Sequence, residues 1–263
     1  MEIIKQQQEK ALYPDIEWSK PENSNNFGKL LIVGGSANNI ADPSSAYQKA
    51  IDFGISNIRV IVPISAKRNL PVALPFIDFA PSNPSGSFSK QATNIVRDFA
   101  SQSDCLLLCG GFGKNSETAI VIENLLEENQ GLSTITGDGV DYFIETPNKI
   151  INRPNTIIIA SFSQLQKIVK NNPHSKALLF SNNLSQTLNT LSEFAPKINS
   201  YIITEKDGVL ILTSKQGIIT TKILGSKINW QLNVSCQASF WSMINKNKIF
   251  ESCATAISQM AKI

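Results

Sequence analysis

The chain has 263 residues, of which 42% are hydrophobic and 17% charged, and its formal net charge is +3. A chain of this length and composition buries a core of its own, and it needs no disulfide or metal to fold. The small net charge, without a dense basic run, argues against nucleic acid or an anionic membrane as a partner. The single histidine, His174, lies in a polar stretch that we expect to be an exposed turn, and no metal site is expected within the chain.

The pattern of predicted strands indicates one α/β domain along most of the chain. Residues 1–27 are expected to be a peripheral segment, and residues 28–263 are expected to form one domain. Short β-branched runs alternate with helix-length segments, which predicts an α/β protein with a mostly parallel sheet covered by helices. Asp207-Gly208 favours a hairpin in the C-terminal third. The predicted strands are 29–33, 58–63, 104–109, 133–136, 156–160, 177–180, 200–204, 208–213 and 217–221.

The predicted helices fill the segments between these strands. Asp42-Pro43 is expected to open one of them, with Asp42 as its N-cap and Pro43 in its first turn. A short surface helix is expected near the N-terminus, and two helices close the chain. The predicted helices are 5–12, 42–54, 91–101, 116–128, 163–169, 184–194, 238–245 and 249–261.

The cysteines indicate a reducing compartment. Cys105, Cys109, Cys236 and Cys253 show neither metal nor redox spacing, and the first two lie in an apolar run as small buried hydrophobes. Free thiols favour a cytoplasmic location. The first residues, 1–5, lack the apolar core of a signal peptide, and no apolar run has the length of a membrane span, so no membrane partner is expected.

Two glycine loops follow predicted strands and precede predicted helices: Gly34-Gly35-Ser36 and Gly110-Gly111-Phe112-Gly113. Glycine lets the backbone approach a ligand closely, and the positive end of the following helix favours an anion. Gly34, Gly35, Ser36, Gly110, Gly111 and Gly113 are therefore predicted to bind a phosphate-bearing nucleotide or small molecule, with Lys114 able to reach a phosphate. The alternative is that these glycines only turn the chain. Neither loop matches a P-loop or the dinucleotide fingerprint.

The order of these loops resembles the ADP/ATP-dependent NAD(P)H-hydrate dehydratases, which are ribokinase-like proteins. The resemblance covers roughly residues 28–260. It rests on the strand and loop at 28–36, on 104–113, which is similar to the family's Gly-Pro-Gly-Leu-Gly signature, and on 135–140, where the family has Leu-Asp-Ala-Asp-Ala-Leu. The resemblance implies a ribokinase-like three-layer α/β/α fold with a C-terminal hairpin region, and ADP or ATP with Mg²⁺ as cofactors.

The chain departs from this family at three places. The family's catalytic aspartate follows two glycines before the penultimate helix, and by position Gln237 stands for that aspartate in Asn233–Gln237. Glutamine cannot act as a general base near neutral pH. The stretch 160–164 replaces the family's Thr-Pro-His-x-Gly-Glu, and Thr136 replaces the first aspartate of the Asp-Ala-Asp pair.

Asp138 is the remaining candidate for a catalytic carboxylate, because it stands at the second position of the family's aspartate pair. Its alternative role is that of an ordinary loop aspartate that accepts bonds from neighbouring N–H groups. Asp42 is expected to cap its helix, and Asp104 is expected to be structural. Trp230 lies near the expected nucleotide loop and could cover an adenine.

Three functions remain open at the level of the sequence. The resemblance implies repair of hydrated NAD(P)H by phosphorylation and elimination, with lost or altered activity. The alternative is a non-catalytic ribokinase-like protein that binds a nucleotide or serves in assembly, including a homo-oligomer. A further alternative is a small-molecule kinase. The substitution at Gln237 favours the non-catalytic protein, because both kinds of enzyme need the same aspartate.

Overall fold

A ten-stranded sheet runs through the centre of the protein in a computed structural model, which describes residues 1–7, 11–69, 76–172, 175–223 and 229–262. The strand order is β1-β10-β9-β8-β7-β6-β5-β2-β3-β4. All neighbours from β8 to β4 are parallel, β9 is antiparallel to β8 and β10, and β1 is parallel to β10. The strands are β1 (Ile3–Gln6), β2 (Leu30–Gly34), β3 (Ile58–Pro63), β4 (Ile77–Ala80), β5 (Cys105–Gly110), β6 (Leu132–Thr136), β7 (Thr156–Ile159), β8 (Tyr201–Lys206), β9 (Val209–Ser214) and β10 (Gly217–Lys222).

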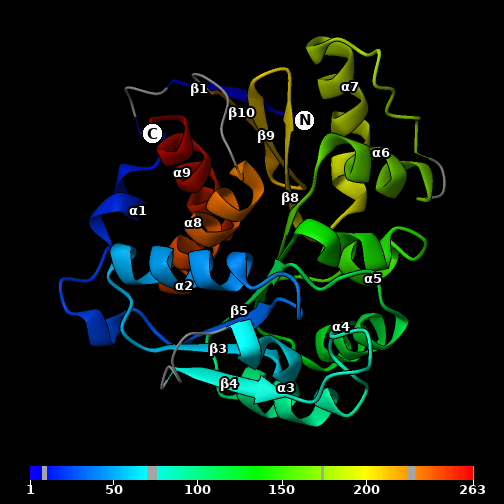
Figure 1. Ribbon diagram of the computed structural model, residues 1–263. Coiled ribbons are helices and arrows are strands. Elements are labelled where there is room, and N and C mark those ends of the chain that lie inside the picture. Colours follow the sequence, from blue (N-terminus) through cyan, green and yellow to red (C-terminus); the bar gives the residue numbers. More distant parts are fainter. Residues whose placement is uncertain (8–10, 70–75, 173–174, 224–228, 263) are drawn as a thin grey trace.

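Helices cover both faces of the sheet and give the molecule three layers (Figure 1). Helices α1, α2, α8 and α9 share one apolar cluster with one sheet face, and α3 to α7 share a second cluster with the other face. The helices are α1 (Pro14–Trp18), α2 (Ala41–Phe53), α3 (Ala92–Ser101), α4 (Ser116–Glu128), α5 (Asn148–Ile151), α6 (Phe162–Lys170), α7 (Leu184–Phe194), α8 (Trp230–Ile244) and α9 (Ile249–Lys262), and the 3-10 segments are η1 (Ser24–Asn26), η2 (Ile64–Asn69), η3 (Gly137–Phe143) and η4 (Ala195–Lys197).

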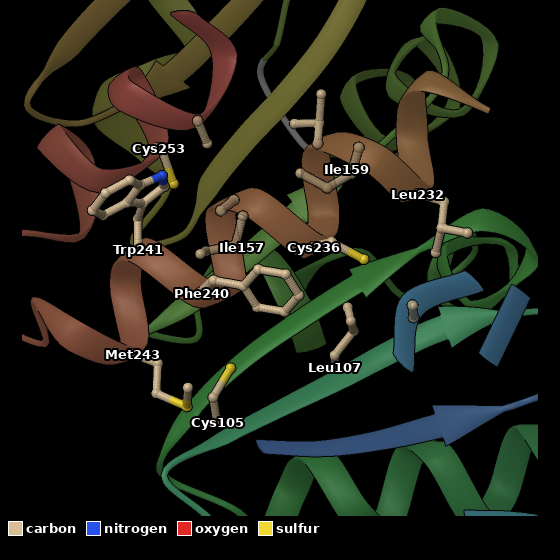
Figure 2. Packing of buried hydrophobic residues seen from close by; sticks show 14 of the residues in the cluster. Cys105, Leu107, Ile157, Ile159, Leu232, Cys236, Phe240, Trp241, Met243 and Cys253 are labelled. Carbon is tan, nitrogen blue, oxygen red and sulfur yellow. The ribbon is translucent and has the colours of Figure 1, made fainter. Parts of the chain in front are cut away.

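Helix α8 is buried against the sheet. It lies between the sheet and α9, and Figure 2 shows Phe240 and Cys236 directed toward Cys105 and Leu107 of β5. The side chain of Ser239 donates a hydrogen bond to the hydroxyl of Thr134 at 2.8 Å, where a larger residue would separate the helix from β6. Small side chains on this face therefore let α8 approach the strands closely.

Most of the predicted strands and helices are confirmed, and α4 begins and ends at the predicted residues 116 and 128. One predicted strand is wrong. Residues 177–180 form no strand, and Leu179 and Phe180 are 53% and 77% exposed. An apolar run of four residues does not by itself distinguish a strand from a connecting segment. The structure adds β4, which was not predicted, at one edge of the sheet.

The N-terminal segment is built into the fold rather than lying outside it. The expected helix over 5–12 is wrong at Lys5 and Gln6, which belong to the edge strand β1, and residues 8–10 lie outside the described part. Ile16 of α1 is fully buried. His174 also lies outside the described residues. Among the helices of the described ranges, none combines the length and apolar character that a membrane crossing requires.

Candidate functional site

The carboxyl ends of β2, β5 and β6 bring both glycine loops to one edge of the sheet, where ligands bind in open α/β proteins. A cavity of about 310 Å³ opens there between the strand ends and the first turn of α8. We call it the carboxyl-edge cavity; its lining residues are Asp42, Cys109, Thr136, Gly137, Asn229, Trp230, Gln231 and Leu232.

The first glycine loop uses its N–H groups within the protein. Gly35 donates to the carbonyl of Gly110 at 3.0 Å, and Ser36 donates to the carbonyl of Asn39 at 2.9 Å. The next N–H, of Ala37, donates to the carbonyl of another loop at 2.8 Å. A Cβ at Gly34 would lie 2.4 Å from the sulfur of Cys109, so this glycine is needed for the close approach of β2 and β5. These three N–H groups are therefore not directed at a ligand.

The second glycine loop directs its N–H groups at a carboxylate of the chain itself. The N–H groups of Phe112 and Gly113 donate to the two oxygens of Asp138, at 3.3 and 2.9 Å. Gly110, Gly111 and Gly113 all have positive φ, so the loop curves in the way that collects N–H groups around an anion. Asp138 provides that anion. It therefore acts as the loop aspartate that the sequence left as an alternative, and its two oxygens hold the loop.

Asp42 is the carboxylate that lines the carboxyl-edge cavity. The structure places the N-cap of α2 at Ile40, so Asp42 lies in the first turn, and the expectation that it is the cap is wrong. Its side chain accepts a hydrogen bond from Asn39 at 3.2 Å and approaches Gly111. The pKa of Asp42 is raised, mainly by burial. The hydrogen bond from Asn39 lowers this pKa, and the nearby charge of Asp138 raises it. The sequence did not distinguish this residue from a surface cap.

Helix α8 begins eight residues earlier than the sequence predicted, at Trp230 rather than 238. The expected loop at Asn233–Gln237 is wrong, because α8 begins at Trp230 and Gln237 is its eighth residue. Gln237 faces a different cavity, near Lys49 and Asp52 of α2. The first turn of α8 contains Trp230, Gln231 and Leu232 instead. No aspartate or glutamate occurs anywhere between Asp207 and Glu251, so the lack of an acid here does not depend on the alignment.

Gln231 takes part in a hydrogen-bond network at the site. Its amide nitrogen lies 3.4 Å from the carbonyl of Ile159 and 3.5 Å from the amide oxygen of Gln164. Gln164 in turn donates to the carboxylate of Asp141 at 2.8 Å. The side chain of Thr136 contacts the same carbonyl of Ile159, at 3.4 Å. Neutral amides and a hydroxyl, from Gln231, Gln164 and Thr136, thus form this side of the site.

Lys114 lies outside the carboxyl-edge cavity. It lines a separate, larger cavity on the side of α4 and α6. The structure thus brings Gly34, Gly110 and Asp138 to one strand edge but directs Lys114 elsewhere. Within the described part of the chain, no group of three or more His, Cys, Asp and Glu side chains could hold a metal ion.

These contacts do not fit a phosphate held by the glycine loops. Three N–H groups of the first loop and those of Phe112 and Gly113 in the second already have acceptors, and two carboxylates, Asp42 and Asp138, flank Gly110 and Gly111. Like charges repel, so a phosphate could bind here only if Asp138 moved away and a positive charge balanced the remaining negative charge. The expectation that the glycine loops cradle ADP or ATP is not supported by this geometry.

Comparison with solved structures identifies the architecture. A ribokinase-like superfamily protein from Enterococcus faecalis superimposes with a TM-score of 0.73 at 13% identity, over 99% of this chain and 86% of that chain. The chain has the ribokinase-like fold. The ADP/ATP-dependent NAD(P)H-hydrate dehydratase of Bacillus subtilis, co-crystallised with ATP/Mg²⁺, matches with a TM-score of 0.64 at 9% identity, over 100% and 88% of the two chains.

A neighbour with a lower score is the phosphomethylpyrimidine kinase of Clostridium difficile, with a TM-score of 0.53 at 12% identity, over 89% of this chain and 100% of that chain. No protein-family model and no curated protein sequence matches the chain. The ribokinase-like layers expected from the resemblance are thus confirmed by structure, while sequence comparison assigns no family.

Proposed function

We propose that this protein is a non-catalytic member of the ribokinase-like group that binds a small ligand in the carboxyl-edge cavity. The observation that carries the proposal is the first turn of α8, which contains Trp230 and Gln231. No aspartate or glutamate occurs between Asp207 and Glu251, so none is available in this helix. Phosphoryl transfer by the expected mechanism needs a base near the attacking hydroxyl, and an amide does not accept a proton near neutral pH.

The structural neighbours support a nucleotide as the first ligand to test. The dehydratase from B. subtilis and a ribokinase from E. coli were both crystallised with ATP and magnesium. In this chain the ring part of such a ligand has Trp230 and Gln231 to contact, while most N–H groups of the glycine loops already have acceptors within the protein. Binding is therefore expected to depend more on the indole and amide than on the phosphates.

The experiment combines binding with turnover. Thermal unfolding is measured with Mg²⁺ and ADP, ATP, adenosine, NADH or NADPH, and turnover is assayed on hydrated NADH with ADP or ATP. A ligand at about 100 times its Kd should raise Tm by about 2–4 °C. Trp230→Ala should abolish the rise, and Trp18→Ala, a change at an 82% exposed indole elsewhere, should not. Turnover by the wild type, or no rise with any ligand, would contradict the proposal.

An active dehydratase or small-molecule kinase is the second candidate, and Asp42 is the observation that favours it. This carboxylate lines the same cavity, and its raised pKa makes it a better base than an exposed aspartate. If the wild type shows turnover, Asp42→Asn should abolish it, whereas Asp98→Asn on the exposed surface of α3 should leave it unchanged. Turnover that survives Asp42→Asn would exclude Asp42 as the base.

A further inference from the structure

The carboxyl-edge cavity carries a negative charge. Asp42 is the one charged side chain among its described lining residues, which include no lysine, arginine or histidine. Burial raises the pKa of the Cys109 thiol, so this lining group is protonated near neutral pH and adds no charge. The pKa of Asp42 is itself raised, first by burial and also by the charge of Asp138, which lies outside the lining. A second carboxylate therefore adds to the negative charge, and no cation in the described lining balances it.

Asp42 has few partners within the protein. Its carboxylate accepts one hydrogen bond, from the side-chain amide of Asn39 at 3.2 Å, and it takes part in no ion pair among the described residues. An ionised carboxylate has acceptor sites for about four hydrogen bonds. A half-buried carboxylate with a single neutral donor is therefore stabilised by a ligand that supplies both N–H donors and a positive charge.

Two neutral side chains of the lining also offer acceptors. The amide nitrogen of Gln231 lies 3.4 Å from the carbonyl of Ile159, which can only accept, so the orientation of this amide is fixed. The same nitrogen lies 3.5 Å from the amide oxygen of Gln164, and the oxygen of Gln231 has no donor among the described residues. The hydroxyl of Thr136 donates to the carbonyl of Ile159 at 3.4 Å and keeps its lone pairs as acceptors. Both side chains thus favour a ligand that brings donors.

The beginning of α8 has two opposite effects on the charge of a ligand. The positive end of a helix equals roughly half an elementary charge and favours an anion. Asp42 contributes a full negative charge and Asp138 a second one nearby, so the balance at the cavity stays negative. Trp230, in the first turn of α8, adds its indole to the lining, and indole is the aromatic group whose face attracts cations most strongly. The sum of these terms favours a cation.

We propose that the carboxyl-edge cavity binds a small, planar organic cation with N–H donors, such as an amidine or a protonated nitrogen heterocycle. Its N–H groups donate to Asp42 and to the amide oxygen of Gln231, and its flat face contacts the indole of Trp230. The cavity volume of about 310 Å³ is at the lower end of small-molecule sites, about 300–1,000 Å³, so the ligand is compact. The inference rests on the proposed function and names the class of its ligand.

Isothermal titration calorimetry with benzamidine, benzamide and benzoate tests the inference, because these probes share one ring and carry a positive, no and a negative charge. The wild type should bind benzamidine at least about tenfold more tightly than benzoate, with benzamide between them. This comparison needs no variant, so it does not depend on whether a variant folds.

Variants then assign the preference to the cavity. Asp42→Asn should weaken the Kd of benzamidine by about tenfold or more and that of benzamide by less than about twofold. The control, Asp98→Asn, removes the same charge from an exposed position on α3 and should leave both Kd values within about twofold. Trp230→Leu should weaken the binding of benzamidine and of benzamide by about threefold or more, because both rings lose the indole.

Three results would overturn the inference. They are no heat with benzamidine on the wild type, binding of benzoate as tight as that of benzamidine, or an equal loss of benzamidine binding in Asp42→Asn and Asp98→Asn. A rise of Tm with adenosine or ATP that Trp230→Ala abolishes, together with a preference for benzoate, would overturn this inference and leave the proposed function standing. Turnover on hydrated NADH, together with a preference for benzamidine that Asp42→Asn removes, would do the reverse.

Discussion

At the scale of single residues, two aspartates with similar sequence settings have different roles. Asp138 gives both oxygens to N–H groups of the second glycine loop, whereas Asp42 faces a cavity and has one amide donor. The sequence left Asp138 open between a catalytic carboxylate and an ordinary loop aspartate, and it predicted Asp42 as a helix cap. Burial and hydrogen-bond partners, which the local sequence does not specify, decide which carboxylate remains available.

Asp42 is expected to make stability depend on pH in the acid range. Its pKa is raised above the ordinary value of 3.8, mainly by burial, so the folded chain holds this proton more tightly than the unfolded chain. Ionisation of Asp42 therefore lowers the free energy of unfolding as pH rises from about 3.8 through the raised pKa. The Asp42→Asn variant has no carboxyl group to ionise here, so it does not lose this stability. Its free energy of unfolding should therefore rise relative to that of the wild type from acid to neutral pH.

Urea unfolding at a series of pH values measures this difference. Asp98→Asn, at an exposed position of α3, is the control, and its stability relative to the wild type should change less over the same range. A difference for Asp42→Asn that stays constant, or that decreases toward neutral pH, would show that the folded chain does not raise this pKa.

At the scale of elements, α8 decides both the packing and the site. Ten of its 15 residues are buried, and it contacts the sheet on one side and α9 on another. A helix buried on several sides lacks the apolar stripe that marks a helix in a sequence. Its first residue follows Asn229, which has positive φ and no capping side chain, so the beginning of α8 carried no recognisable signal.

Phe240 is expected to be among the costliest positions of α8 to truncate. Its ring is fully buried, lies 5.2 Å from the ring of Phe53 on α2, and is directed toward β5 (Figure 2). Phe240→Ala should lower the free energy of unfolding by about 3–5 kcal/mol, because it leaves a cavity between helix and sheet. Guanidinium unfolding measures the change. Trp18→Ala, at an exposed aromatic, should cost less than about 0.5 kcal/mol.

At the scale of the whole molecule, the sheet is closed at one edge by the first residues of the chain. Strand β1 pairs with β10 from Ile3 to Gln6, and the side chain of Gln6 accepts a hydrogen bond from Thr221 at 3.2 Å. More than 210 positions of sequence separate these partners. The edge of β10 is thus covered by a segment that the sequence predicted to be peripheral, with a helix beginning at Lys5.

Removal of residues 1–7 is expected to destabilise the fold and to expose this edge. The unpaired N–H and C=O groups of β10 would then be available to another chain. Tm should fall by about 2–4 °C for each kcal/mol lost, and light scattering should show association that increases with concentration. Lys5→Ala, which changes an exposed side chain but keeps the strand, should do neither. An unchanged Tm after deletion would show that β1 contributes nothing to stability.

The sequence by itself determined where β2, β3 and β5 to β10 lie along the chain, most helix bounds, and the arrival of two glycine loops at one edge of the sheet. These features follow from local hydrophobic periodicity and glycine chemistry, which neighbouring residues encode. It also determined that no acid lies between Asp207 and Glu251, whatever the alignment.

Only the tertiary structure decided that α8 begins at Trp230, that β1 joins β10, and that Asp138 fills the second glycine loop. Each depends on contacts between residues far apart in the chain, up to 215 positions for Gln6 and Thr221. Such contacts select among local alternatives of similar energy, and propensity carries no information about them. The filled glycine loop is the clearest case, because the same residues could surround a phosphate if Asp138 lay elsewhere.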